Sequence, residues 1–435
     1  MKNPNASEAP VLSPEPLFSR GLKAYTVGLL TLIYTANYVD RQIVAILLQS
    51  IKTDMDLSDT QLGLLTGPAF GVFYATLGIP IAYLADRMSR KKIIIASLTL
   101  FSVMTFVCGL AQNYVQLLLA RVGVGVGEAG TSPPSHAIIA DMYGPADRAA
   151  PLAVFALGIN IGLFAAFLVG GYIGDTYGWR VAVQVVAVPG LALAVLAWFT
   201  LRDPPRGMSD NKTSGTAPPL AQTFAYMWHT KSIRQLIIAS TLVITVGYGA
   251  VAWLPSYFIR VHGMSATQVG GVLAIMIGIG GGLGTAFGGI FADKLGKRDV
   301  RWNLWLVALV TMGVAPLSIV GYLTTDTLLA LVWLTLPLFV GALYFGPTLA
   351  MLHTLVKPEM RSLASAIMLC INNIIGLGVG PLSVGYLSDQ FTPVYGPQGL
   401  GYALACMAVI GIWGGAHYWL ASRTLSADIE KAQAT

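Results

Sequence analysis

The sequence is poor in charged residues and in cysteine. Only 11% of its 435 residues are Asp, Glu, Lys or Arg, whereas soluble domains carry about a quarter. A soluble fold of this length could not bury the 55% of residues that are hydrophobic, so the composition excludes an ordinary soluble protein. The three cysteines, Cys108, Cys370 and Cys406, all lie in apolar runs, which excludes a disulfide framework.

The chain also lacks the motifs of a membrane enzyme. It has no HExxH motif, no paired histidines and no serine motif with partner residues, and lipid chemistry would need such a group near the membrane surface. Gly125-x-Gly127-x-x-Gly130 spells a dinucleotide fingerprint, but it follows no strand and lies in an apolar run, where small residues favour close helix packing. We therefore expect no enzyme activity, no cofactor and no metal site.

Long apolar runs dominate what is present. A membrane-spanning helix needs about 20 mainly apolar residues, and the sequence predicts twelve of them. The first six lie at 25–49, 59–84, 92–112, 113–141, 150–174 and 179–201. The other six lie at 232–259, 266–293, 301–323, 327–354, 360–388 and 399–421. A polar segment rich in Pro, Gly and Ser separates the halves, so we predict bundles at 1–201 and 232–435 with a linker at 202–231.

Basic residues are distributed unevenly between the two sets of predicted loops. Loops on the side of the termini hold most of them, including Arg87, Lys91, Arg148, Arg206, Lys297 and Arg298. The opposite loops hold only Lys52, Arg180 and Arg260. Because positive loops stay in the cytoplasm, we expect a multi-pass protein of the inner cell membrane, with both termini and the linker cytoplasmic. The net charge of +6 then reflects topology, not binding to nucleic acid.

Three motifs recur in the same order in both halves. Ala82-x-x-x-Asp86-Arg87-x-Ser89-Arg90-Lys91 is matched by Gly289-x-x-x-Asp293-Lys294-x-Gly296-Lys297-Arg298. Pro145-x-x-Arg148 is matched by Pro358-x-x-Arg361, and Gly171-Tyr172-x-x-Asp175 by Gly385-Tyr386-x-x-Asp389. Two six-helix halves in parallel repeat are typical of carriers that rock about a central site.

The repeated loop with Asp86 and Asp293 resembles the signature of the major facilitator superfamily, and the resemblance covers the whole chain. It implies an all-α membrane protein with twelve transmembrane helices in two six-helix bundles. The first copy departs from the pattern at Ala82 and Ser89, where the family usually has Gly. The Gly-Pro pattern of many antiporters is absent from 150–174, so antiport cannot be argued from it.

Two further motifs, Asn37-Tyr38-x-Asp40-Arg41 and Arg121-x-Gly-x-Gly-x-Gly-Glu128-Ala129, resemble the spinster family. That family is associated with the export of sphingolipids and lysolipids. The resemblance implies transport of a lipid-like solute.

Four ionisable residues lie deep in predicted spans: Asp40, Arg41, Arg121 and Glu128. Such residues cost several kcal/mol in a membrane. At a rise of 1.5 Å per residue, Asp40 and Arg41 fall between Glu128 at the midplane and Arg121 roughly 9 Å outside it. We expect one network of zero net charge, in which Asp40 and Glu128 carry protons. Arg41 and Arg121 would be counter-charges or contacts for an anionic group. The alternative is a fixed ion-pair lattice that joins two helices.

No comparable charges are found in the spans of the second half. We expect a substrate cavity lined by Asn37 from the first half and by Tyr248, Trp253, Tyr257, Tyr344, Asn372 and Asn373 from the second. For each aromatic residue alone, ordinary helix packing is an alternative.

The repeated loop also predicts a cytoplasmic gate. Asp86 ends a helix, where the dipole disfavours an anion, and in the superfamily this residue docks on helix eleven. Arg90 is placed to pair with Asp141, and Asp293 is the counterpart of Asp86 in the second half.

These features predict a monomeric, proton-coupled secondary active transporter for an amphipathic, lipid-like or drug-like solute. Its partners would be that solute, protons and membrane lipids. A carrier of small organic anions and a non-transporting sensor with this fold remain alternatives.

Overall fold

In the described residues, 18–434 without 86, 145–146, 207 and 209–218, the computed structural model contains helices and loops and no strand. The helices of the first half are α1 (Arg20–Met55), α2 (Asp59–Thr66), α3 (Pro68–Ala85), α4 (Arg90–Cys108), α5 (Tyr114–Glu128), α6 (Ser132–Met142), α7 (Ala149–Tyr177) and α8 (Trp179–Thr200). Those that follow are α9 (Leu220–His229), α10 (Lys231–His262), α11 (Ala266–Leu273), α12 (Gly280–Gly296), α13 (Trp302–Leu323), α14 (Thr327–Val340), α15 (Phe345–Leu355), α16 (Arg361–Ile371), α17 (Gly378–Tyr395) and α18 (Gly399–Ala434). Two π-helical turns, η1 (Ala274–Ile279) and η3 (Asn372–Leu377), join α11 to α12 and α16 to α17. The short 3₁₀ turns are η2 (Pro358–Met360) and η4 (Gly396–Gln398).

The helices of the described residues can be compared with the predicted number of membrane crossings. Within the described part of the chain, nine helical stretches are long and apolar enough to cross a membrane. The last of these, Pro358–Ala432, holds two successive crossings, α16–α17 and α18. The remaining two crossings are α1 and α5–α6, which contain the charged residues discussed above. The helices are therefore consistent with twelve spans.

Several spans differ in detail from the predicted helices. The helix predicted at 113–141 is interrupted between α5 and α6, where Pro133 and Pro134 follow Gly130 and cannot continue the backbone hydrogen bonds of α5. The predicted linker contains the short helix α9, and α18 continues to Ala434, well past the predicted end at 421.

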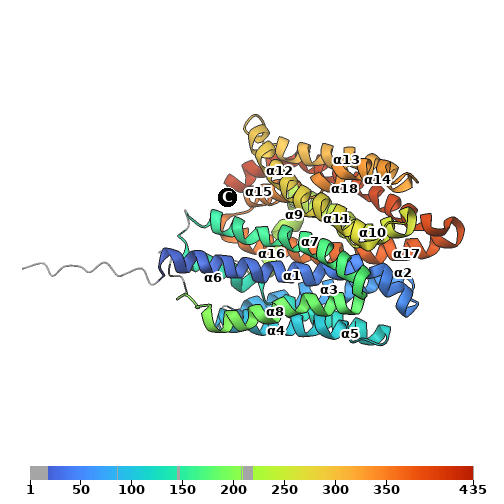
Figure 1. The fold of residues 1–435 in the computed structure, drawn as a ribbon. Coiled ribbons are helices and arrows are strands. Elements are labelled where there is room, and N and C mark those ends of the chain that lie inside the picture. The colour runs from blue at the N-terminus through green and yellow to red at the C-terminus, as the bar shows by residue number, and fades with distance from the viewer. Residues whose placement is uncertain (1–17, 86, 145–146, 207, 209–218, 435) are drawn as a thin grey trace, which may run out of the picture.

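The helices lie side by side in two groups (Figure 1). In this view α4, α5 and α8 lie at one side and α13, α14 and α18 at the other, with α1, α7, α10 and α11 between them. Helix α1 begins and α18 ends at the same end of the molecule (Figure 1). We call the opposite end, where α1 ends at Met55 and α2 begins at Asp59, the distal face.

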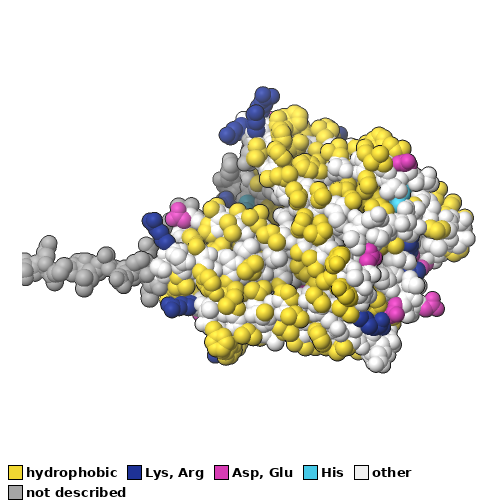
Figure 2. All heavy atoms as spheres, viewed as in Figure 1, with side chains coloured by type: hydrophobic (Ala, Val, Ile, Leu, Met, Phe, Trp, Pro, Cys, Tyr) yellow, Lys and Arg dark blue, Asp and Glu magenta, His cyan; other side chains and the backbone are white. Residues whose placement is uncertain are grey.

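Surface side chains follow the pattern of a protein that spans a bilayer. Figure 2 shows most of the visible Lys and Arg toward the end where α18 stops, a few at the distal face with most of the visible acids, and apolar side chains along the flank. The chain is an integral, multi-pass membrane protein.

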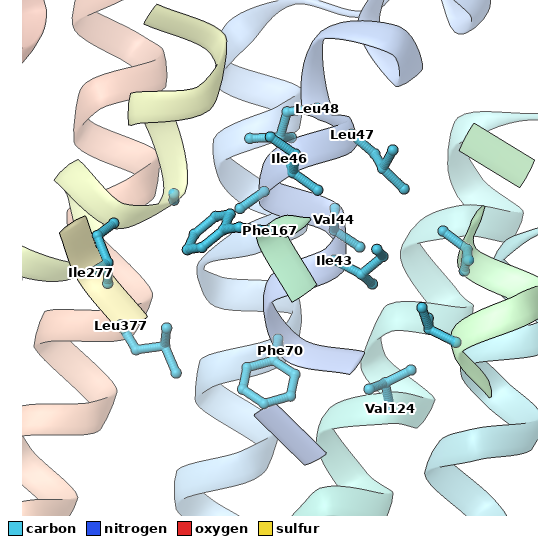
Figure 3. Packing of buried hydrophobic residues seen from close by; sticks show 14 of the residues in the cluster. Ile43, Val44, Ile46, Leu47, Leu48, Phe70, Val124, Phe167, Ile277 and Leu377 are labelled. Carbon is cyan, nitrogen blue, oxygen red and sulfur yellow. The ribbon is translucent and has the colours of Figure 1, made fainter. Parts of the chain in front are cut away.

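The two groups of helices share a buried apolar core. Ile43 and Ile46 of α1 and Phe70 of α3 belong to the same cluster as Ile277 of η1 and Leu377 of η3 (Figure 3). Contact between the halves thus involves both π-helical turns.

Candidate functional site

A buried ion pair joins α1 to α5. Nε and Nη2 of Arg41 both donate to Oε2 of Glu128, at 3.1 and 2.8 Å, and the Glu128 side chain is fully buried. The Arg41 guanidinium also lies over the rings of Tyr38, Phe70 and Tyr74, with its central carbon 4.8, 4.8 and 4.5 Å from their centroids. Arg41 therefore points into the protein, with a carboxylate and three aromatic faces as its partners.

Asp40 and Arg121 lie next to this pair but do not form a second one. The Thr105 hydroxyl donates to Oδ2 of Asp40 at 3.2 Å, and Nη1 of Arg121 donates to the backbone carbonyl of Asp40 at 3.4 Å. Oδ1 of Asp40, Oε1 of Glu128 and Nε of Arg121 are buried without a hydrogen-bond partner among the described residues. The four charged residues thus lie together, with Arg41 and Glu128 as an ion pair and Asp40 and Arg121 beside it without a salt bridge of their own in the part of the chain that the structure describes.

Glycines of α5 make this arrangement sterically possible. A Cβ on Gly127 would lie 2.6 Å from the backbone nitrogen of Phe101, and one on Gly125 would lie 2.7 Å from the carbonyl oxygen of Phe70. Because these positions lack a side chain, α5 packs directly against α3 and α4. That packing brings Glu128 within reach of Arg41.

Asn37 lies one turn before Arg41, beside the break between α5 and α6. Its amide nitrogen donates to the hydroxyl of Thr131 at 2.6 Å, and that hydroxyl contacts the Glu128 carbonyl at 3.0 Å. The amide oxygen of Asn37 has no partner among the described residues. Asn37 therefore belongs to the same polar region as Glu128.

Residues of both halves meet at a small pocket beside Arg41. It has a volume of about 20 Å³, and Arg41, Thr66, Tyr248 and Leu377 are among its lining residues. The Tyr248 hydroxyl donates to the amide oxygen of Asn373 at 3.4 Å. Tyr248 thus lines the same pocket as Arg41 and contacts Asn373.

The other amide predicted for the cavity is satisfied within the second half. The Asn372 amide oxygen accepts hydrogen bonds from Ser240 and Thr241 at 3.2 and 2.9 Å. Tyr344 lies at the break between α14 and α15 and packs against the apolar cluster of the second half.

Two aromatic residues predicted for the cavity instead pack inside the second half. Trp253 is fully buried and its indole donates to the Pro381 carbonyl at 2.8 Å. The hydroxyl of Tyr257 donates to the carbonyls of Gly321 and Tyr322 at 2.9 and 3.1 Å. A buried aromatic with a polar end finds a backbone partner, so both side chains join helices to one another, and their placement at the cavity is corrected.

The predicted gate is corrected in one respect. Arg90 and Asp141 do form a buried ion pair, but it joins α4 to α6 inside the first half. This pair by itself links two helices of one bundle, so a gate between the bundles would need further contacts. Asp86 lies outside the described residues, as does the side chain of Asp293 in α12.

A group of polar contacts that sequence reasoning did not identify joins the halves at the distal face. Asp59 is 1% exposed. Its carboxylate accepts two hydrogen bonds from Arg260, at 2.6 and 2.7 Å, and one from Ser388 at 2.6 Å. Lys52 of α1 pairs with the same carboxylate. These contacts fasten α1 and α2 to α10 and α17.

Two more carboxylates at this face bind the first backbone amides of helices in the other half. Asp389 of α17 accepts from the backbone nitrogens of Asp59 and Thr60, at 2.9 and 2.7 Å. Asp175 of α7 accepts from those of Ala266 and Thr267, at 3.2 and 2.6 Å. Carboxylates are favourable there because the first amides of a helix lack partners and its dipole attracts an anion. We call these contacts, together with those of Asp59, the distal closure.

The repeated Gly-Tyr-x-x-Asp motif was the signal for these two contacts. A Cβ on Gly171 would lie 2.4 Å from the Ala266 carbonyl oxygen, and a Cβ on Gly385 would lie 2.2 Å from that of Asp59. In both halves the glycine lets a helix of the other half approach, and the aspartate one turn later binds the amino-terminal end of that helix.

Comparison with known proteins shows the family. The family model described as Major Facilitator Superfamily matches residues 30–336. An "MFS-type efflux pump" of Mycolicibacterium smegmatis is 36% identical over 93% of this chain and 93% of its own length. "Protein spinster homolog 1" of Homo sapiens is 26% identical over 95% of this chain and 83% of its own.

A solved structure gives the same result. It is the crystal structure of a bacterial homolog to the human lysosomal transporter spinster, in an inward-facing and unoccupied conformation. It covers 94% of this chain and 99% of its own, at 30% identity and a TM-score of 0.86. This chain belongs to the major facilitator superfamily of membrane transporters, and within it to the spinster-like proteins.

Proposed function

We propose that this chain is a proton-coupled secondary transporter that moves an amphipathic, lipid-like or drug-like solute by alternating access. The names of the relatives support a transport function, since one is named an efflux pump and others are named spinster homologues. The observation that carries it is the buried cluster of Asp40, Arg41, Arg121 and Glu128.

The cluster is costly for a structural role alone. A buried polar atom without a hydrogen bond costs about 1–3 kcal/mol, and Asp40, Arg121 and Glu128 each have one. Apolar side chains of similar size would hold α1 against α5 at least as well as an ion pair does. Carboxylates with an unused oxygen are therefore better explained as sites that gain and lose protons during transport.

Proton binding at Glu128 would change what Arg41 can bind. A protonated Glu128 no longer neutralises the guanidinium, which stays among the rings of Tyr38, Phe70 and Tyr74 and at the edge of the pocket. An anionic headgroup can then take the place of the carboxylate. Proton uptake and binding of an anionic amphiphile are in this way linked at one side chain.

The pocket has room for about one water in the described state, but its lining indicates which surfaces would meet a solute when it widens. Tyr248, Ala252 and Leu377 come from the second half and provide mainly apolar surface opposite Arg41. A molecule with a charged end and an apolar body would contact the first half through its charge and the second half through its body. Release would then follow when the two halves separate.

The direction of opening follows from the distal closure. If both termini are cytoplasmic, the contacts of Asp59, Asp175 and Asp389 close the outer side of the transporter. The described structure would then be closed to the outside, as expected of an inward-facing transporter. Opening to the outside requires that these contacts break.

Transport in proteoliposomes tests the proposal. We would measure uptake of a fluorescent lysophospholipid and of a lipophilic cationic dye, each with and without a pH gradient. In Glu128→Gln, the increase in uptake caused by the gradient should fall at least ten-fold. Exchange of solute without a gradient should continue. Glu359→Gln, a change of the same kind at an exposed position of η2, is the control and should behave as wild type.

Three outcomes would contradict the proposal in different ways. Unchanged stimulation in both Glu128→Gln and Asp40→Asn would remove the proton-carrying role. Transport of a small organic anion without transport of either amphiphile would favour the organic-anion alternative. Absence of transport of any of these probes by the folded wild-type protein would favour a sensor.

A further inference from the structure

A groove on the membrane-facing side of α17 is separate from the pocket beside Arg41. Its volume is about 500 Å³, within the range of roughly 300–1,000 Å³ that small-molecule sites occupy. The two cavities lie on different faces of one helix, since Pro381 lines the pocket at Arg41 and Leu382 lines the groove. The groove is therefore not part of the proposed transport path.

Helices from both halves form the walls of the groove. Leu382, Ser383 and Tyr386 of α17 form one wall, and Met407 and Ile410 of α18 form another. Thr60, at the start of α2, comes from the first half. A molecule in the groove would thus touch both bundles next to the distal closure.

The surroundings of the groove identify the chemistry of its occupant. Tyr386 at its edge is 55% exposed, and so is much of the apolar surface of α17 and α18, including Val379 at 45% and Val409 at 52%. In a membrane protein these side chains face the hydrocarbon of the bilayer. The groove is continuous with that surface, so acyl chains are the molecules it meets.

The depth of the groove, measured from the distal face, is within reach of one leaflet. Met407 and Ile410 lie about 12 and 17 Å along α18 from its distal end. Half of a hydrocarbon core of about 30 Å is about 15 Å. The polar side chain of Thr60 lies at the distal end of α2, where headgroups would be, and its hydroxyl donates to Asp389 at 2.6 Å. One chain entering from the distal leaflet would reach the depth of Ile410.

We propose that this groove is a binding site for one acyl chain of a bilayer phospholipid from the leaflet at the distal face. The chain packs between α17 and α18 and touches Thr60, so it holds the start of α2 against α17. The bound lipid is a structural ligand of the distal closure, distinct from any transported solute. This proposal does not depend on proton coupling or on the substrate.

Met407 provides a specific reporter. It lines the groove and is only 3% exposed, so the small surface that it offers lies at the wall of the groove. We would reconstitute the protein with a phosphatidylcholine that carries a diazirine near the end of one acyl chain. Illumination followed by mass spectrometry would then locate the adducts.

Filling the groove should abolish that adduct. Ser383→Trp places a large side chain in the groove, whereas Val195→Trp adds the same bulk at a lipid-facing position of α8 that is 60% exposed. We expect adducts on Met407 in wild type and Val195→Trp, and at least five-fold fewer in Ser383→Trp. Added phosphatidylcholine should raise the Tm of the first two proteins in detergent but not that of Ser383→Trp. If Ser383→Trp does not fold, Ile410→Trp serves the same purpose.

Two results would overturn the proposal. One is equal labelling of Met407 in wild type and in a folded groove-filling variant. The other is displacement of the label by a few mole per cent of lysophosphatidylcholine but not by excess unlabelled phosphatidylcholine, which would assign the groove to a single-chain amphiphile.

Discussion

Arg260→Gln removes the main cation of the distal closure. Its partner Asp59 is 1% exposed and would keep only Lys52 and Ser388. Breaking a buried ion pair by removing one partner costs about 3–5 kcal/mol. Because Lys52 still compensates part of the charge, we expect a loss of about 2 kcal/mol from the closed state alone. At 1.4 kcal/mol per factor of ten, this is roughly a 30-fold shift toward distal opening.

The assay is the distance between the two halves at the distal face. Spin labels at Thr53→Cys of α1 and Val394→Cys of α17, both exposed positions, would be placed in a protein whose three native cysteines are replaced. Pulsed electron resonance in lipid nanodiscs then gives the ratio of long to short distances. This ratio should rise roughly 30-fold in Arg260→Gln.

Arg180→Gln is the matched control. It also removes an arginine from an ion pair at this face, but its partner Asp54 belongs to the same half. The distance ratio should therefore stay at the wild-type value. An unchanged ratio in Arg260→Gln, or an equal rise in Arg180→Gln, would refute the idea that the Asp59–Arg260 pair holds the halves together.

Two further predictions use the same distance measurement. Gly270→Ala should favour the distal-open state, because its Cβ would lie 2.2 Å from the Phe167 carbonyl oxygen. Gly271→Ala is the control and should leave the distance ratio unchanged, because its Cβ would meet nothing within 4 Å. Equal distance ratios in the two variants would contradict this prediction. Asp175→Ala and Asp389→Ala each remove a carboxylate from a helix start, at about 1 kcal/mol or roughly five-fold in the ratio. If neither variant changes the distance ratio, these carboxylates do not contribute to the distal closure.

The architecture could be predicted because it depends on local properties of the chain. Apolar runs of sufficient length must cross the membrane as helices, since the backbone has no other partner in hydrocarbon. The repeated motifs indicated two related halves, and Asn37, Asp40, Arg41 and Glu128 marked the polar region of the first half. Ionisable residues are rare enough in membrane spans that their position within an apolar run identifies them.

Contacts between helices could not be predicted in the same way. Each span is a helix whatever its neighbours are, so its sequence does not specify which side chain of another span it will meet. Only the tertiary structure pairs Arg41 with Glu128 and leaves Arg121 beside the backbone of Asp40. It likewise places Trp253 in helix packing, although an aromatic in a span is equally suited to a cavity.

The distal closure shows the same division most clearly. The motifs ending in Asp175 and Asp389 were visible as a repeat, Arg260 as a charge in a loop, and Asp59 only as the first residue of a predicted span. Their common role depends on α7 approaching α11 and α17 approaching α2, which bring together residues about 90 and 330 positions apart. The sequence determined which segments enter the membrane and which charges they carry, and the packing of glycine-bearing helices decided which of those charges meet.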